Sequence, residues 1–296
     1  MESWWCWMRA WVDSELCKLC LIYSRSQDLV KVKHTDILHE LLIKIADLIQ
    51  TSAGRSYVFA NSFNIVKQIT NLEDPYKHVK KELNQVGVQL AQLIRGELEA
   101  VGWDIRIAMR FSAAANIIDT STLGYEPLDL QKAIWHEPFI EEEVVLPRNK
   151  HIYLVLDNAG EAAVDLLLAY ALMKNGYRVS IIVRSESYEI DVLKDDLMDL
   201  RELIDEDVEI IETPGNMPPI FYIDNDDSYV IAKGIANLEA SLEINRTNSL
   251  HLLRAKCDVL AKALRVPKNS PLIITGETFK KVIQENMLIR EQSSKV

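Results

Sequence analysis

Apolar residues in the first third of the chain recur at the three- to four-residue spacing of helices. The pattern predicts helices over about residues 36–50, 74–102 and 104–118. The second begins with Asp-Pro, in which a capping side chain precedes a residue suited to the first helical turn. Gly102 can end the same helix in a left-handed conformation. We therefore predict a helical domain over residues 1–110.

The remainder of the chain alternates short strand-like runs with helical runs. Strands are predicted at residues 151–157, 178–184, 208–213, 228–234 and 271–275. Helices are predicted at residues 161–175, 194–206 and 250–264. This alternation favours a mainly parallel sheet with helices on both faces, which makes a three-layer α/β domain. We assign that domain to residues 111–296.

Composition and charge narrow the partners of the protein. The 296 residues are 48% hydrophobic and 26% charged, which is ordinary globular usage, and the net charge is -11. An acidic chain is poorly suited to nucleic acid or to an anionic membrane surface, because both attract excess Lys and Arg. The start of the chain lacks a basic leader followed by a long apolar run, so we expect a cytoplasmic protein. A phosphorylated small molecule remains possible, since a bound cation can supply positive charge.

Polar residues follow three of the predicted strands, and ligands of open α/β sheets bind outside the carboxyl ends of strands. Asp157 and Asn158 end the first strand, and Asp191 lies in the loop after the second. Their oxygens are hard ligands that favour Mg²⁺ or Mn²⁺. The helix that starts near Gly160 would point its free N–H groups at an anion. Lys233, at the end of a third strand, could neutralise a phosphate oxygen.

Each of these residues also fits an ordinary structural role. Asn158 followed three positions later by Glu161 fits a helix cap with its acidic partner. Asp191 stands among acidic residues typical of a solvated loop, and Lys233 precedes a glycine as in many turns. The residues alone leave both interpretations open.

Cys17 and Cys20 form a C-x-x-C pair. A zinc site would need a second ligand pair at matching spacing, and a thioredoxin-like site would need a neighbouring βαβ pattern. The sequence offers neither, so the pair is interpreted as two cysteines at the start of a helix.

Six segments resemble motifs of one known family. Residues 154–168, LVLDNAGEAAVDLLL, resemble the central motif of the damage-control phosphatases, long catalogued as a domain of unknown function. Further segments resemble family motifs in the same order, at residues 15–21, 74–84, 113–120, 231–239 and 252–274. Together they span nearly the whole chain, and the similarity is greatest to the compact archaeal-type members.

The resemblance implies both a fold and an activity. The fold would be a helical N-terminal part followed by a Rossmann-like α/β part. The activity would be hydrolysis of phosphate monoesters of small metabolites, such as sugar phosphates, with a divalent ion of magnesium, manganese, cobalt or nickel as cofactor.

The same resemblance assigns residues by motif position. The metal ligands would be Asp157, Asn158 and Asp191. Asp157 would be the catalytic residue, and whether it or a water molecule attacks phosphorus is left open. The substrate pocket would contain Glu161, Asn116 and Lys233. The resemblance also implies a cluster of Cys17, Cys20 and Cys257.

The chain departs from the family pattern near the expected site. Ile190 stands where Asn is usual before Asp191, and Leu193 stands where Thr is frequent. These replacements remove polar groups, so the alternative hypothesis is a phosphometabolite-binding protein with weakened catalysis. A third hypothesis is an adenosylmethionine-dependent methyltransferase, which the absence of a glycine-rich loop after the first strand disfavours.

Overall fold

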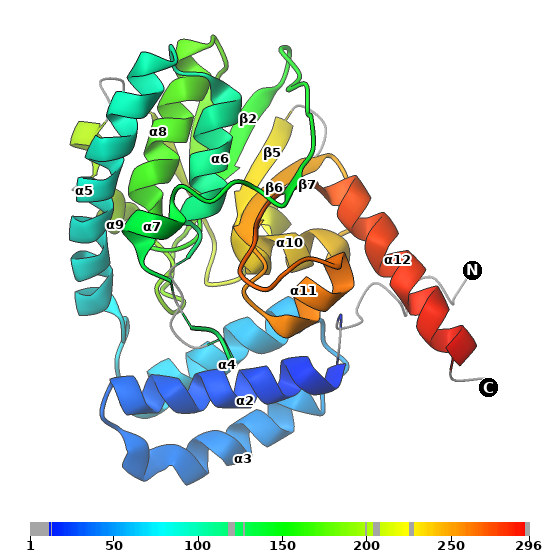
Figure 1. Ribbon diagram of the computed structural model, residues 1–296. Coiled ribbons are helices and arrows are strands. Elements are labelled where there is room, and N and C mark those ends of the chain that lie inside the picture. Colours follow the sequence, from blue (N-terminus) through cyan, green and yellow to red (C-terminus); the bar gives the residue numbers. More distant parts are fainter. Residues whose placement is uncertain are drawn as a thin grey trace.

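The computed structural model describes residues 12, 14–117, 122–126, 128–198, 200–203, 208–224 and 228–293. It confirms an α/β protein with a helical N-terminal region and a mainly parallel sheet (Figure 1). Within the described residues, no helix is long and apolar enough to cross a membrane.

The central sheet has the strand order β1-β7-β6-β5-β2-β3-β4. The strands are β1 (Ile140–Glu141), β2 (His151–Val155), β3 (Val179–Arg184), β4 (Glu209–Thr213), β5 (Ser228–Lys233), β6 (Ser249–Arg254) and β7 (Pro271–Thr275). Strands β6, β5, β2, β3 and β4 run parallel, and β7 is antiparallel to β6. The short strand β1 pairs with β7 in parallel.

The site lies where the strand order changes direction. From β2 the chain proceeds to β3 and β4, and it then returns to β5 on the other side of β2. Val155 of β2 is level with Ile182 of β3 and with Ala232 of β5. The carboxyl ends of these strands therefore meet at a topological switch point, which is where open sheets form their ligand crevices.

Helices cover both faces of the sheet (Figure 1). One face carries α5 (Lys77–Ala100), α6 (Ile105–Ala115) and α8 (Glu161–Lys174). Every residue of α8 from Glu161 to Leu172 is buried, because this helix packs against the sheet and against α5 and α6. The other face carries α10 (Gly234–Glu243), α11 (Asp258–Leu264), α12 (Gly276–Ser293) and the 3-10 helix Pro219–Tyr222.

A separate helical cluster stands at the carboxyl end of the sheet. It contains α2 (Ser14–Lys31), the 3-10 helix Thr35–Ile37, α3 (Leu38–Ile49) and α4 (Arg55–Thr70). Its hydrophobic core also takes in Tyr188 and Ile190 from the loop after β3. The division of the chain after residue 110 remains a prediction, and α5 and α6 pack against α8 beside the sheet.

Several predicted helices match closely. The expected helices at 36–50, 74–102 and 161–175 correspond to α3, α5 and α8. Gly102 follows α5 with a φ of 67°, as predicted. The helix expected over 104–118 is α6, which ends at Ala115, and position 118 lies outside the described residues.

Two predicted helices are wrong in part. Ser249–Arg254, expected to begin a helix, forms strand β6, and α11 starts only at Asp258. All six residues of β6 are buried between β5 and β7, so its sequence lacks the alternation that marks a strand with one solvent face. In place of the helix expected over 194–206, the described residues form α9 (Lys194–Met198) and the 3-10 turn Arg201–Leu203, and positions 199 and 204–206 lie outside the description. The short helix α7 (Leu130–Ala133), α4, α10 and β1 were not predicted.

Candidate functional site

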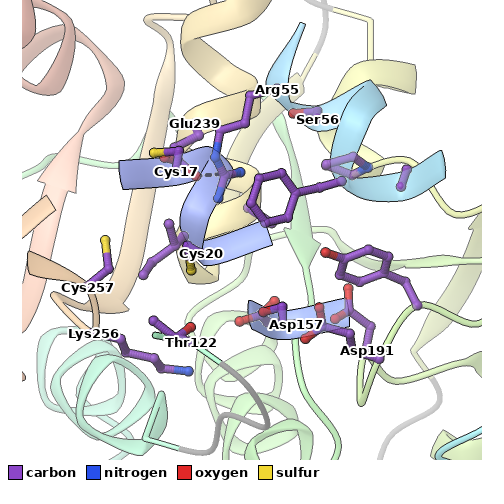
Figure 2. A pocket seen from close by; sticks show the side chains of 18 of the residues that line it. Cys17, Cys20, Arg55, Ser56, Thr122, Asp157, Asp191, Glu239, Lys256 and Cys257 are labelled. Carbon is purple, nitrogen blue, oxygen red and sulfur yellow. Dashed lines mark ion pairs between the residues drawn. The ribbon is translucent and has the colours of Figure 1, made fainter. Parts of the chain in front are cut away.

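A pocket of about 130 Å³ lies between the helical cluster and the carboxyl ends of the strands. Figure 2 shows its two sides. We call five of the polar lining residues at or just after the strand ends the sheet wall: Asp157, Asn158, Arg184, Asp191 and Lys256. We call the residues from α2, α4 and α10 the helix wall: Cys17, Cys20, Arg55, Ser56, Phe59 and Glu239.

The proposed metal ligands come together through backbone pairing of two loops. Asn158 and Asp191 form an isolated antiparallel bridge. The N–H of Ala159 donates to the carbonyl of Ile190 at 2.9 Å, and the N–H of Val192 donates to the carbonyl of Asp157 at 2.8 Å. Residues 33 positions apart in sequence therefore share one site, and each of the three predicted ligands is buried yet lines the pocket.

Gly234 leaves room for the Asp157 carboxylate. Its φ is 78°, a left-handed conformation that glycine adopts without a steric penalty. A Cβ atom at this position would lie 1.9 Å from Oδ2 of Asp157. The glycine that follows β5 is therefore required by the carboxylate that follows β2.

The side chain of Asn116 forms hydrogen bonds to the carboxylates of both Asp157 and Glu161. Its amide nitrogen donates to Oδ2 of Asp157 at 3.0 Å and to Oε2 of Glu161 at 2.6 Å. Its Oδ1 accepts the N–H of Arg254 at 3.2 Å, which fixes the orientation of the amide. The amide of Asn158 also donates to Oε1 of Glu161, at 2.9 Å. Asn116 and Glu161 are thus adjacent to the pocket carboxylates, although neither is among the residues that line the pocket.

Burial dominates the electrostatics of the sheet wall. It raises the pKa of Asp157, and it raises the pKa values of Glu161 and Asp191 to about 7 each. Lys256 opposes the shift at Asp157 and Glu161, and Arg184, whose Nε lies 2.5 Å from Oδ2 of Asp191, opposes it there. The negative charge of Asp157 further raises the pKa values of the other two carboxyl groups.

This donor set fits a divalent ion. The negative charge of Asp157 raises the pKa of Glu161 and of Asp191, and a bound cation would relieve that repulsion. Two Asp carboxylates and one Asn amide supply the hard oxygen donors that Mg²⁺ and Mn²⁺ prefer. The described part of the chain contains no group of three or more His, Cys, Asp and Glu side chains placed to hold a metal ion. The candidate set depends on the amide of Asn158 as its third member.

The two lysines near the site have different surroundings. Lys233, predicted to contact the substrate, is fully buried and does not line the pocket. Its Nζ lies 3.2 Å from Oδ1 of Asp165 and donates to the carbonyl of Ser112. Lys256 lines the pocket, with its Nζ 3.8 Å from Oε1 of Glu161. Lys256 therefore lines the pocket, whereas Lys233 is buried outside its lining, and the role of Lys233 in substrate binding stays a prediction.

The start of α8 does not form the predicted cap. Gly160, not Asn158, is the N-cap residue, with a φ of 82°. Its N–H donates to Oδ1 of Asn84 in α5 at 2.8 Å. A Cβ at Gly87, one turn further along α5, would lie 2.2 Å from the carbonyl oxygen of Gly160. The N–H of Gly160, which we expected to face an anion, thus donates to Asn84 because α5 lies close to the start of α8.

The helix wall carries its own buried ion pair. Nη1 of Arg55 lies 2.6 Å from Oε2 of Glu239, and the guanidinium lies 4.1 Å from the ring centroid of Phe59. Cys17, Cys20 and Cys257 all line the same pocket, in keeping with the cluster that the resemblance implied. Burial raises the pKa of Cys257 to about 12, which keeps this thiol protonated.

Comparison with known proteins identifies the family. The damage-control phosphatase ARMT1-like domain matches residues 15–272, which is most of the chain. The chain belongs to this family. It is 25% identical over 226 residues to the damage-control phosphatase PH1575 of Pyrococcus horikoshii, covering 70% of this chain and 76% of that protein. It is 22% identical over 281 residues to a damage-control phosphatase of Archaeoglobus fulgidus, covering 86% of this chain and 95% of the relative.

A solved structure supports the fold of this family member. The crystal structure of the DUF89 family protein PH1575 from Pyrococcus horikoshii superimposes with a TM-score of 0.70 at 22% sequence identity. The match covers 88% of this chain and 97% of the crystallised one. The helical N-terminal region and the mainly parallel sheet are therefore shared.

Sequence reasoning missed several residues of the pocket. Arg184 is the last residue of β3, and Lys256 lies just after the end of β6. Ligands bind outside the carboxyl ends of strands, so this rule could have selected Arg184 from the predicted strand and would have selected Lys256 had β6 been recognised. Arg55 and Glu239 lie on helices whose local sequence carries no signal for a pocket. Only the packing of α4 against α10 brings these two together.

Proposed function

We propose that this protein is a metal-dependent phosphatase that hydrolyses phosphate monoesters of small metabolites in the pocket between the two walls. The observation that carries the proposal is the convergence of Asp157, Asn158 and Asp191 at the switch point of the sheet, beside Lys256. Membership of the damage-control phosphatase family supports the same reaction class. We place the enzyme in the cytoplasm, as expected from its sequence.

The chain supplies positioning and charge. A divalent ion held by Asp157, Asn158 and Asp191 would, when bound, polarise a phosphoryl oxygen. Lys256 projects into the pocket and offsets the negative charge of the phosphate. Asn116 holds Asp157 and Glu161 through one amide, so the two carboxylates keep their relative orientation. Phosphoryl transfer needs little covalent work from a protein, so fixed geometry is its main contribution.

The helix wall favours hydroxylated substrates such as sugar phosphates. The charge of Arg55 is already matched by Glu239, so a second anionic group on the substrate would face a carboxylate. A hydroxyl group, by contrast, can accept a hydrogen bond from Arg55 and donate one to Glu239. Nε of Arg55 is buried and has no hydrogen-bond partner among the described residues, which leaves a donor for such a group. The volume of about 130 Å³ suits a small molecule.

The binding-protein hypothesis remains the alternative outcome. It was motivated by Ile190 and Leu193, which replace polar residues of the family pattern. Ile190 is 1% exposed and packs in the core of the helical cluster, and neither side chain lines the pocket. The replacements therefore do not fill the space that a substrate would occupy, and this placement favours the phosphatase.

Phosphate release tests the proposal directly. We would assay a generic aryl phosphate and a panel of sugar phosphates with Mg²⁺, Mn²⁺, Co²⁺ or Ni²⁺, and with chelator. The expected result is metal-dependent release that Asp157→Asn abolishes and that Asp47→Asn, at an exposed position of α3, leaves unchanged. Turnover that survives both chelator and Asp157→Asn would refute the assignment. Tight calorimetric binding of a phosphometabolite without turnover would favour the binding protein.

A further inference from the structure

The turn that carries Asp191 contains a strained residue. The N–H of Asp191 donates to the carbonyl of Tyr188 at 2.9 Å, which closes a four-residue turn. Glu189, the second residue of this turn, has a φ of 43°. Turns with a positive φ at this position favour glycine, because a Cβ atom is crowded there. A glutamate in such a place implies that its side chain has a role that offsets the strain.

The side chain of Glu189 reaches a fixed partner in the helical cluster. Its carboxylate accepts a hydrogen bond from Nη2 of Arg25 in α2, 164 residues away in the sequence. Arg25 is fully buried, and its Nε lies 3.0 Å from Oδ2 of Asp28, one turn further along α2. The guanidinium also lies 5.1 Å and 5.6 Å from the ring centroids of Phe63 and Tyr188. Arg25 is therefore a rigid anchor rather than a surface cation.

The contact between Arg25 and Glu189 lies close in sequence to the proposed metal ligand Asp191. Glu189 stands two residues before Asp191, and the Val192 N–H that follows Asp191 is bonded to the carbonyl of Asp157. The turn is thus held on one side by the sheet wall and on the other by α2. Release of Glu189 would leave Tyr188 and Ile190 packed in the helical core but would remove the polar contact at the apex of the turn.

We propose that Arg25 is a positioning residue that acts through Glu189 to hold Asp191 in place for metal binding. The helical cluster then does more than cover the pocket, because α2 determines the geometry of the turn that carries one proposed ligand. This inference rests on the proposed function for the role of Asp191. It does not depend on which phosphometabolite is hydrolysed.

The test uses the full chain and two readouts that need no turnover. Mn²⁺ binding is measured by the loss of the free-ion paramagnetic resonance signal, and backbone opening of residues 185–193 is measured by hydrogen exchange. Glu189→Gly suits the positive φ and removes the anchor. We expect about ten- to hundredfold weaker Mn²⁺ binding, as for residues that orient metal ligands, and faster exchange of the turn.

Two further variants separate positioning from other roles. Arg265→Gly is the matched control, because Arg265 follows α11 with a φ of 55° and does not line the pocket; Mn²⁺ binding should not change. Arg25→Met keeps the Glu189 carboxylate but removes its contact with Arg25, so it should weaken Mn²⁺ binding as Glu189→Gly does. The double variant should bind no more weakly than the weaker single variant, since both remove one interaction. If Arg25→Met does not fold, Arg25→Lys takes its place, because it keeps a buried positive charge beside Asp28 but lacks the guanidinium fork that reaches Glu189.

The outcomes are distinct. Wild-type Mn²⁺ affinity and unchanged exchange in Glu189→Gly would overturn the inference. Weak binding in Glu189→Gly with normal binding in a folded Arg25→Met would also overturn it, since Glu189 would then act without Arg25. If the wild-type chain bound no Mn²⁺, the proposed function would fail, whereas faster exchange in Glu189→Gly would still support the anchor.

Discussion

The two walls of the pocket are built in different ways. The sheet wall places its carboxylates on short loops at the carboxyl ends of β2 and β3, where backbone pairing and the amide of Asn116 fix them. The helix wall places Arg55 and Glu239 on two helices that meet through packing, and their main polar partner is each other. We infer that the sheet wall carries the chemistry common to a reaction class, whereas the helix wall can vary with the substrate.

The largest effect should come from Gly234→Ala. The added Cβ would lie within bonding distance of the Asp157 carboxylate and force it out of position. A misplacement of about 1 Å can cost about a hundredfold in rate, so we expect at least that loss in kcat. Gly176→Ala is the control, because Gly176 also has a positive φ, of 82°, but its Cβ would meet no atom within 4 Å. Equal activity losses in both variants would show that backbone strain, not the carboxylate, is responsible.

The two lysines should respond differently to the same substitution. Lys256→Met should lower kcat/KM about a hundredfold, the usual cost of losing one charge-stabilising donor. Lys233→Met should instead destabilise the fold by about 3–5 kcal/mol, because it leaves Asp165 buried without its cation. Phosphate release and urea unfolding measure the two effects. A stable, inactive Lys233→Met protein would return Lys233 to the substrate pocket.

Low pH should lower the free energy of unfolding through the buried side chain of His251. His251 in β6 is fully buried, and burial lowers its pKa to about 3 from an ordinary 6.5. The unfolded chain therefore binds a proton that the folded chain does not, and the stability contributed by neutral His251 is lost as pH falls below about 6.5. Between pH 7 and pH 5 this one group should cost about 2 kcal/mol. Urea unfolding of His251→Gln should show a correspondingly smaller loss over this range, and equal losses in both proteins would contradict the assignment.

The smallest effect should come from the helix wall. Arg55→Lys keeps the charge beside Glu239 but loses the planar fork of donors. We expect KM for a hydroxylated phosphate monoester to rise about fivefold with kcat little changed, as when binding to the ground state and transition state is weakened equally. Steady-state kinetics on one substrate measures this. A fall in kcat at constant KM would instead assign Arg55 to the same role as the sheet wall.

Many of the helices and strands could be predicted, because the spacing of apolar residues in the sequence matches the faces that are buried in the folded protein. The face of α5, the termination by Gly102 and the strand β2, which ends two residues before Asp157, follow from residue spacing and from glycine chemistry. β6 was not predictable, because a strand buried on both faces has no alternation to distinguish it from a buried helix. That error concealed Lys256, which lies two residues after the end of the strand.

The sequence by itself determined the family, because its motifs match in order along the chain, and it predicted Asp157, Asn158 and Asp191 as metal ligands because they follow predicted strands. It also determined an acidic α/β chain. The tertiary structure decided which lysine faces the pocket, which helices form its second wall and how Arg25 reaches Glu189. Those contacts join residues more than a hundred positions apart, and they depend on burial and close approach that no local pattern records.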